Sequence, residues 1–552
     1  MQFRHFLRTP NPSEQWGASL SGLLVAERQT TTARRLTGLV KRMSLPFGWR
    51  KVVSPGAELW ENAGVAAGYT YLGQFIAHDC VQTSVPTGAL AAGDGLAMSR
   101  RNKLLALDSL YGGGPDGSPM IFAPVDANHP MRNMFALSRA SLSTTEEREC
   151  PFLDIGRARL HRGNSTYANG YSNALVADAR NDVHAVAAQM TVLFKLLHNR
   201  VLERVVANTG RKAGPSADIA QYRAYYVTRF LCERIFRLIV RKDYLKTLLH
   251  PAVVERYDRA VPAFVDEQSA ETLPVEFAQA LRFGHAMVRP KYVMNDTRPE
   301  GEDLIDMLLT TSGSRPWRTP VDETWIVAWD RFFAMGQTAP NWSRRIGPEF
   351  SEGLLAPDVF GPIDATRCLG LPYRDLVNGA GSNMWSINCL AREVCNRMPE
   401  LSSQSKLLSS PAYRRKKIAA WLGKYRAATS LTDDDVSALS DDPPLFVYVL
   451  FEAASEMDGR QLGVLGSIIL AETLYRALAN REFPDLGPLE QHGCSHEDLA
   501  RIVFGSAEMG PAITRSSPRI GSMMELVRFL RANWQVPLPH LPRTEHIADT
   551  VH

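Results

Sequence analysis

The sequence is poor in cysteine and lacks any long hydrophobic run. Its 552 residues include only 7 cysteines, an odd number without a CxxC spacing. This pattern argues against a disulfide framework or a cysteine-rich zinc site, and favours buried free thiols in a reducing compartment. The longest apolar stretches, residues 445–454 and 462–471, reach about half of the ~20 residues that cross a bilayer. Because the first residues also lack the apolar core of a signal peptide, we expect a soluble cytoplasmic protein.

The chain also lacks an excess of charge of either sign. Lys and Arg number 62 against 58 Asp and Glu, which leaves a formal net charge of +4. Without a dense basic stripe, the sequence offers no electrostatic footprint for nucleic acid. The motifs HExxH, Walker A, GxSxG and GxGxxG, which mark several common enzyme classes, are missing as well. With 45% hydrophobic and 22% charged residues, the composition is that of an ordinary globular protein.

What the sequence does have is helical periodicity. Apolar residues recur at a spacing of 3.6 in several segments, whereas a stretch rich in glycine and proline predicts long loops. We expect a mainly α protein in which one large helical domain carries long loops and few short strands. The predicted helices cover residues 68–80, 182–206, 222–249, 273–288 and 443–476, with loops over 81–135. The expected organisation is an N-terminal arm (1–55), one large domain (56–540) and a C-terminal tail (541–552).

Two histidines stand in segments that suggest chemistry. In GYTYLGQFIAHDC (68–80), Gln74 and His78 lie four residues apart and project from the same side of a helix, where they could hold a water or a peroxide. In ALRFGHAMVRP (280–290), His285 follows Gly284 inside an apolar helix. A helical glycine costs about 1 kcal/mol relative to alanine, so a flat cofactor approaching the backbone there would explain its presence. Taken alone, each histidine is more often a hydrogen-bonded core residue than a ligand.

Taken together, these segments resemble the animal-type haem peroxidases of the peroxidase-cyclooxygenase superfamily, and in particular their soluble bacterial members. The similarity extends over about residues 56–480, and its parts occur in the order found in the family. The matching segments are TYLGQFIAHD (70–79), RNKLLALDSLYGGGPDGSP (101–119), LVADARNDVHAVAAQMTVLFKLLHNRV (175–201), LRFGHAMVRPKY (281–292), SINCLAREVCNRMP (386–399) and PPLFVYVLFEAASEMDGRQLGVLGSIILAETL (443–474).

The resemblance implies a haem cofactor and a role for each of five residues. His78 corresponds to the distal histidine, Gln74 to its partner in the distal pocket, and Arg180 to the distal arginine. His285 corresponds to the axial ligand of the haem iron, and Asn388 to the acceptor for its other ring nitrogen. These residue types suit the chemistry. A histidine can take and return a proton of peroxide, a guanidinium supplies a fixed positive charge, and an acceptor behind the axial histidine tunes the iron.

The implied activity is that of a haem peroxidase. In that reaction H2O2 forms a ferryl intermediate, which oxidises a small organic donor, for example in metabolite biosynthesis. The sequence does not identify this donor, nor does it indicate an oligomeric state.

The chain departs from the family pattern at several positions. The family often links haem through esters to carboxylates at the positions of Ala77 and Val183, and neither residue can form an ester. We therefore expect non-covalent haem b with a lower potential, which argues against oxidation of halides. Asp79 corresponds to a calcium ligand of the family, but residues 164–173 offer no carboxylate to complete such a site. Arg392 follows Asn388 by four residues, where the family has three.

Alternative functions stay open. The cyclooxygenase branch, which contains fatty-acid dioxygenases, uses a tyrosine three residues before the proximal histidine, and here Arg282 occupies that position beside the expected cofactor. A haem-binding or sensor protein without turnover is a second alternative. A helical scaffold without haem is a third.

Overall fold

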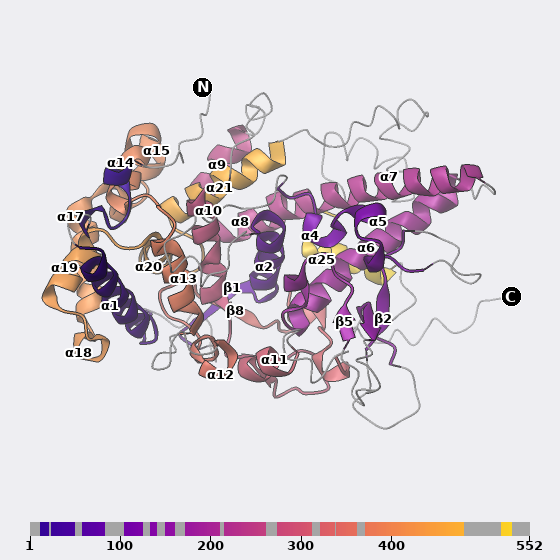
Figure 1. Ribbon diagram of the computed structural model, residues 1–552, viewed down its shortest axis with the longest axis horizontal. Helices are drawn as coiled ribbons and strands as arrows, with labels where there is room; N and C mark the ends of the chain where they lie inside the picture. Colours follow the sequence, from indigo (N-terminus) through magenta and orange to yellow (C-terminus); the bar gives the residue numbers. More distant parts are fainter. Residues whose placement is uncertain are drawn as a thin grey trace.

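The computed structural model describes most of the helical core of the chain. The described residues are 11–20, 24–49, 58–82, 104–124, 133–140, 150–159, 172–209, 215–260, 273–311, 321–336, 338–360, 370–479 and 520–532. Within them, helices surround a central helix and the strands are short (Figure 1). The prediction of a mainly α fold is thus confirmed. Among these residues, no helix is both long and apolar enough to cross a membrane.

The longer helices include two of 25 residues each. The α-helices are α1 (Val25–Met43), α2 (Gly68–Cys80), α4 (Asp108–Tyr111), α5 (Gly114–Gly117), α6 (Ala185–Thr209), α7 (Pro215–Ile239), α8 (Leu245–Leu248), α9 (Pro251–Ala260), α10 (Val275–Ala280), α11 (Leu304–Thr310), α12 (Pro357–Phe360), α13 (Gly370–Ala380), α14 (Ile387–Arg397), α15 (Pro399–Ser402), α16 (Lys406–Ser409), α17 (Pro411–Gly423), α18 (Arg426–Thr429), α19 (Asp433–Asp441), α20 (Leu445–Glu456), α21 (Val464–Ala479) and α25 (Met523–Ala532).

Short 3-10 turns connect many of these helices, and one π-helical turn, η5 (Val240–Tyr244), joins α7 to α8. The 3-10 turns are η1 (Pro12–Glu14), η2 (Ala18–Leu20), η3 (Pro119–Ile121), η4 (Ala179–Asp182), η7 (Leu281–Met287), η8 (Glu323–Trp325), η9 (Trp329–Arg331) and η10 (Glu352–Leu355).

The strands of the described part form antiparallel pairs. These pairs are β1 (Glu61–Ala66) with β8 (Trp342–Arg344), β2 (Leu137–Arg139) with β3 (Leu153–Ile155), β4 (Arg157–Arg159) with β5 (Ser172–Ala174), and β6 (Lys291–Tyr292) with β7 (Glu302–Asp303).

Two of the predicted helices are divided in the structure. The segment 443–476 forms α20 and α21, because Asp458 and Gly459 adopt positive φ angles of 53° and 68° and end the first helix. The segment 273–288 begins as α10 and continues as the tighter η7. The periodic segments 182–206 and 222–249 correspond to α6 and to the series α7, η5 and α8.

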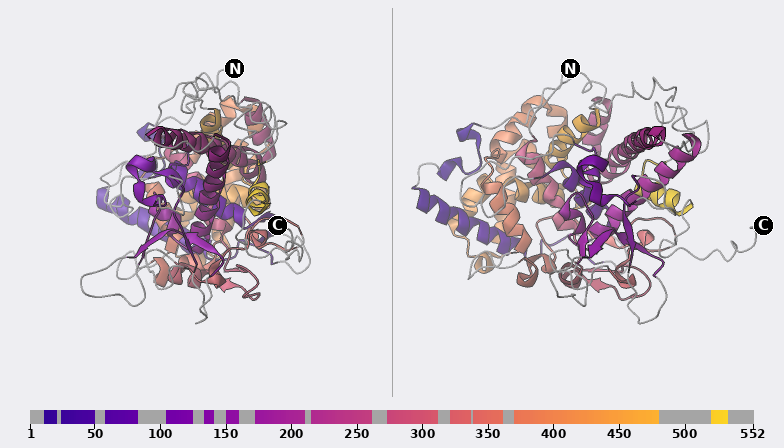
Figure 2. Two further views of the ribbon diagram at one scale, coloured as in Figure 1. Left: turned by 90° about the vertical axis from the view of Figure 1, so that its right-hand side faces the viewer. Right: turned by 45° about the vertical axis from the view of Figure 1, so that its right-hand side comes forward.

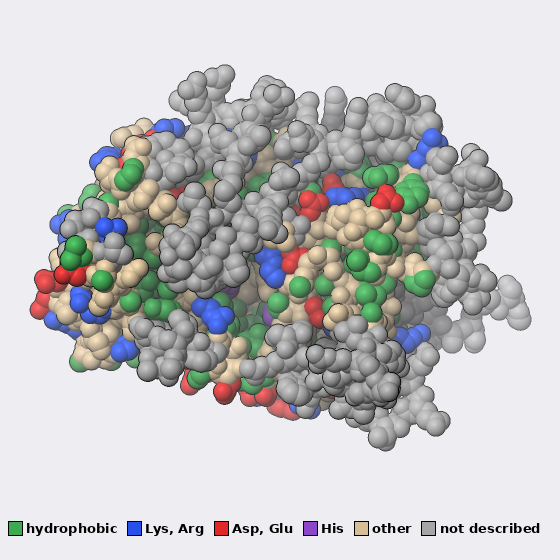
Figure 3. Space-filling model, in the orientation of Figure 1, with side chains coloured by type: hydrophobic (Ala, Val, Ile, Leu, Met, Phe, Trp, Pro, Cys, Tyr) green, Lys and Arg blue, Asp and Glu red, His purple; other side chains and the backbone are tan. Residues whose placement is uncertain are grey.

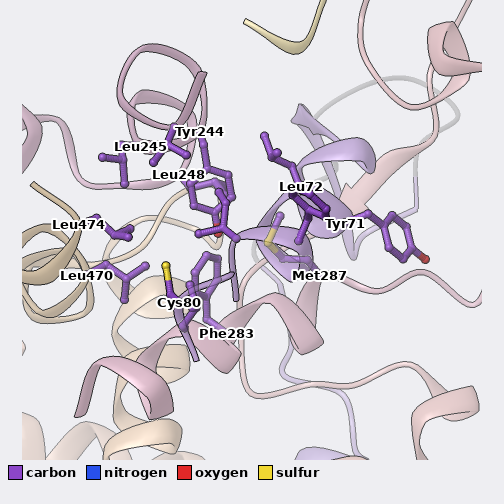
Figure 4. Packing of buried hydrophobic residues seen from close by; sticks show 14 of the residues in the cluster. Tyr71, Leu72, Cys80, Tyr244, Leu245, Leu248, Phe283, Met287, Leu470 and Leu474 are labelled. Atoms are coloured by element: carbon purple, nitrogen blue, oxygen red, sulfur yellow. The ribbon is translucent and has the colours of Figure 1, made fainter. Parts of the chain in front are cut away.

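Helix α2 lies at the centre of the fold and begins directly after β1 (Figure 1). One of its faces packs against η7, η5 and α21, where Leu72 and Cys80 meet Phe283, Tyr244 and Leu470 (Figure 4). The absence of a side chain at position 73 makes this packing possible, since a Cβ there would come within 2.6 Å of the Tyr244 hydroxyl.

Elements from both ends of the sequence share this core. Helix α1 lies beside helices of the second half of the chain, as the two turned views show (Figure 2). Arg34 and Arg35 on α1 pair with the buried Asp435 at 2.8 Å and 3.2 Å. One hydrophobic cluster contains residues as distant as Leu36 and Leu530. Cysteines 80, 150, 232, 389 and 395, which fall within the described residues, form no disulfide bond there.

Candidate functional site

The face of α2 that points away from the core packing carries the predicted distal residues. His78 is buried, whereas Gln74 and Ala77 are half-exposed although the helix is central. The spacing of three and four residues places these side chains on one face, as the sequence predicted. Figure 3 shows a histidine side chain in a recess near the middle of the visible surface. On this face the neighbouring elements leave Gln74 and Ala77 only partly covered.

Residues 178–184 run along this face and hold it in place. Asp178 caps η4 by accepting from the backbone N–H of Arg180, and its carboxylate also binds the Arg180 guanidinium at 2.7 Å. The same guanidinium donates to the carbonyl oxygens of His78 at 2.9 Å and of Val81 at 2.6 Å. Burial acts to raise the pKa of Asp178, but Arg180 holds that pKa below its ordinary value. Arg180 thus fixes the end of α2 through its backbone, a role that the sequence did not indicate.

The ring of His78 is anchored by the residue next to Arg180. Nδ1 of His78 lies 2.9 Å from Oδ1 of Asn181, and Asn181 donates from Nδ2 to the carbonyl oxygen of Ser109 at 3.0 Å. Both side chains are buried. The orientation of His78 is therefore set by two long-range contacts that local periodicity does not show.

A second histidine belongs to this face and was missed by sequence reasoning. Nε2 of His184 lies 3.0 Å from Oε1 of Gln74, and Nδ1 accepts from the backbone N–H of Ala187 at 3.2 Å. Burial, reinforced by the charge of His78, lowers the pKa of His184 to about 3. The available signal was the position of His184, four residues after Arg180. Its neighbour Val183 is half-exposed.

The proximal candidate, His285, lies on η7 together with Arg282. A 3-10 helix has three residues per turn, so these two side chains project in the same direction. Both reach the buried Asp375 of α13: Nδ1 of His285 lies 2.7 Å from one carboxylate oxygen, and Arg282 donates to the other at 2.6 Å. Arg282 also donates to Asn378 at 3.1 Å. Burial acts to raise the pKa of Asp375, but the charges of His285 and Arg282 hold that pKa below its ordinary value.

Asp375 therefore occupies the place that the resemblance assigned to Asn388. Asn388 lies on α14, where it donates to the carbonyl oxygen of Asp441 at 3.0 Å and accepts from Arg414 at 2.5 Å. The correction has a physical reason. The acceptor for His285 is Asp375 of α13. Gln279 of α10 and Arg282 of η7 also donate to Asp375, and these contacts hold α13 against α10 and η7. Sequence spacing around Asn388 carries no information about that packing.

The arrangement around His285 suits a flat cofactor. A Cβ built on Gly284 would meet no atom within 4 Å, so the backbone borders open space there. The His285 side chain is 34% exposed. Among the described residues, the hydrogen bond of the His285 ring is made through Nδ1. A carboxylate that holds the other ring nitrogen is common behind a histidine that binds a metal.

The distal and proximal faces are neighbours. Helix α2 packs directly against η7. The ring of Tyr71 on α2 lies 5.4 Å from that of His184 and 5.7 Å from that of Tyr292, which follows η7. Helix α2, which carries Gln74, Ala77 and His78, thus contacts both elements that hold other predicted residues: η4, which carries Arg180, and η7, which carries Arg282 and His285.

Asp79 does not share the open face of α2. Its two carboxylate oxygens accept from the backbone N–H groups of Leu107 and Ser109, each at 3.0 Å. Leu107 has a positive φ of 54°, so Asp79 stabilises a strained turn before α4. Among the described residues, no group of three or more His, Cys, Asp or Glu side chains could hold a metal ion. Most of the 164–173 segment falls outside the described residues.

Comparison with known proteins found one family match. Residues 130–334 match the family model described as animal haem peroxidase, a region that includes η4 and η7 but not α2. The resemblance found in the sequence is thereby confirmed. No curated protein matches the sequence.

Solved structures with a similar fold include two fatty acid alpha-dioxygenases. That of Oryza sativa has a TM-score of 0.51 and 12% identity, covering 90% of this chain and 79% of that chain. That of Arabidopsis thaliana has a TM-score of 0.52 and 11% identity, covering 90% and 75%. Peroxidase A of Dictyostelium discoideum is similar at a TM-score of 0.48 and 14% identity, covering 85% and 88%. At these identities the dioxygenases show a shared fold and leave the reaction open.

Proposed function

We propose that the chain is a haem peroxidase that uses H2O2 to oxidise a small organic donor, and the match of residues 130–334 to the animal haem peroxidase model supports this proposal. The observation that carries the proposal is the pairing of His285 with Asp375, because a carboxylate behind an axial histidine increases electron donation to iron and favours cleavage of peroxide. On the other face, His78 is held where a histidine can accept and return a proton.

The residues present fit haem. His285 would bind the iron through Nε2, and the backbone at Gly284 next to it borders open space. Bound haem supplies the iron that accepts electrons from the donor and passes them to peroxide. Because Ala77 and Val183 carry no carboxylate, the proposed cofactor is non-covalent haem b.

Calcium is not part of the proposed cofactor set, since Asp79 uses both carboxylate oxygens on backbone amides. A cytoplasmic location is proposed as well, and it is supported by the free thiols of the described cysteines.

A fatty-acid dioxygenase is the second candidate, and it is favoured by the shared fold with the two alpha-dioxygenases. That reaction, as the cyclooxygenase branch performs it, needs a tyrosine three residues before the proximal histidine. Arg282 stands at that position, and its guanidinium is committed to Asp375. This commitment favours the peroxidase.

The test compares two assays on the purified protein after haem binding has been confirmed by a Soret band. A peroxidase oxidises guaiacol in the presence of H2O2 and consumes no oxygen with linoleate or palmitate. Oxygen uptake with a fatty acid, without peroxide-dependent oxidation of guaiacol, would establish the dioxygenase instead. A Soret band with neither activity would leave a haem-binding protein without turnover.

A further inference from the structure

Two consecutive hydrogen bonds connect His78 through Asn181 to the backbone carbonyl of Ser109. They determine which ring nitrogen of His78 carries the proton. Nδ2 of Asn181 donates to the carbonyl oxygen of Ser109 at 3.0 Å. A carbonyl only accepts, so the amide oxygen of Asn181 must face His78. Nδ1 of His78, 2.9 Å from that oxygen, therefore carries the hydrogen. In the neutral ring, Nε2 is then the nitrogen that accepts.

A second series of bonds fixes Gln74 in the same way. The backbone N–H of Ala187 donates to Nδ1 of His184 at 3.2 Å, so Nδ1 holds a lone pair and Nε2 carries the hydrogen. Nε2 then donates to Oε1 of Gln74 at 3.0 Å. This contact turns the amide NH2 of Gln74 away from His184. Burial of His184 keeps the ring neutral, with a pKa lowered to about 3, so the direction of the bond persists at neutral pH.

We propose that Asn181 and His184 are positioning residues that give the distal face one fixed polarity, with Nε2 of His78 as its acceptor and the Gln74 amide as its donor. This inference rests on the proposed peroxidase function and deepens it by naming the class of ligand. A neutral molecule that donates and accepts at neighbouring atoms, as H2O2 does, satisfies both groups. A halide ion can use the donor alone.

The same arrangement indicates which side chain can donate to a bound ligand when the Arg180 guanidinium donates to the backbone of α2. Because four of the five N–H groups of Arg180 already donate to Asp178 and to the carbonyl oxygens of His78 and Val81, we assign the hydrogen bond to a bound ligand to Gln74. One O–H bond of the peroxide breaks and an N–H bond forms at Nε2 of His78. No electrons leave the peroxide in this step, and the proton stays available for return to the other oxygen.

The polarity can be read without turnover from the ferrous carbon monoxide complex. A hydrogen bond donated to the bound ligand lowers its C–O stretching frequency, which infrared spectroscopy measures. His184→Leu releases the Gln74 amide, so the frequency should rise. Gln74→Leu should raise it as well, and the double variant should show no additional shift, because both substitutions remove one interaction. His184→Gln, whose amide can still donate to Gln74, should remain near the wild type.

His250 provides a matched control. Its Nδ1 also accepts a backbone N–H, that of Ala252 at 3.3 Å, but it lies at the start of α9. His250→Leu should leave the frequency unchanged.

Asn181 is tested through the reaction of the ferric protein with H2O2 in stopped flow. Asn181→Leu removes the acceptor for Nδ1 and should slow this reaction by up to ~10²-fold, the lower range for loss of a positioned base. Asn181→Asp still accepts from Nδ1 and should restore most of the rate.

The outcomes separate the inference from the function on which it rests. A protein without a Soret band or a carbon monoxide complex contradicts the proposed function. A normal carbon monoxide complex whose frequency does not respond to His184→Leu, or additive shifts from His184→Leu and Gln74→Leu, would overturn the assigned polarity. Gln74 is half-exposed, so its variant tests the donor even where a substitution of the buried His184 fails to fold.

Discussion

Replacement of Asp375 by asparagine should raise the reduction potential of the bound haem. The carboxylate lies 2.7 Å from Nδ1 of His285 and accepts from Arg282 at 2.6 Å. A hydrogen bond to a charged group contributes about 1.5–3 kcal/mol and a neutral one about 0.5–1.5. The amide therefore weakens the contact with His285 by roughly 1 kcal/mol, at the expense of the ferric state. For a one-electron couple, where 59 mV corresponds to ~1.4 kcal/mol, the expected rise is about 40 mV.

The assay is a spectroelectrochemical titration of the ferric and ferrous forms at constant pH. Asn388→Ala is the control, because Asn388 binds Arg414 and Asp441 and has no contact with His285 among the contacts of the described residues. Asp375→Asn should shift the potential and Asn388→Ala should not. Equal potentials in the wild type and Asp375→Asn, or a comparable shift in Asn388→Ala, would refute the assignment of the proximal partner. Thermal unfolding of each variant separates an effect on potential from a loss of folding.

Three further outcomes are expected. In Gly73→Ala the new Cβ would lie 2.6 Å from the Tyr244 hydroxyl, so the substitution should lower the free energy of unfolding by ~1–3 kcal/mol. Gly423→Ala is the control, because its Cβ would meet no atom within 4 Å, and it should not lower the free energy of unfolding. The pKa of His184 is about 3 in the folded protein against ~6.5 in the unfolded chain. The unfolded state therefore binds more protons between these two pH values. As the pH falls below ~6.5, the free energy of unfolding of the wild type should decrease relative to that of His184→Gln by up to ~1.4 kcal/mol per pH unit, as measured by denaturant titrations. Parallel pH curves for the two proteins would contradict this. Acidic organic solvent should extract the haem completely, and haem retained on the polypeptide in mass spectrometry would indicate a covalent link.

The local features of the chain were predictable because they depend on neighbouring residues. The placement of Gln74 and His78 on one helical face follows from 3.6 residues per turn, and α2 covers the segment in which the sequence pointed to them. The helix of His285 was placed correctly but with the wrong pitch. Its change to 3-10 geometry at Leu281 brings Arg282 and His285 into line, and periodicity of apolar residues does not reveal that change.

The sequence by itself determined the mainly α architecture, the family resemblance and the candidate histidines 78 and 285. Only the tertiary structure decided their partners. Asp375 lies 90 positions from His285, and His184 lies 110 positions from Gln74. Buried polar groups must find hydrogen bonds wherever packing brings an acceptor or a donor, and that choice depends on how α13 meets η7 and how η4 crosses α2. Helical periodicity describes which face of a segment is buried, but not which polar group the opposing segment presents to it.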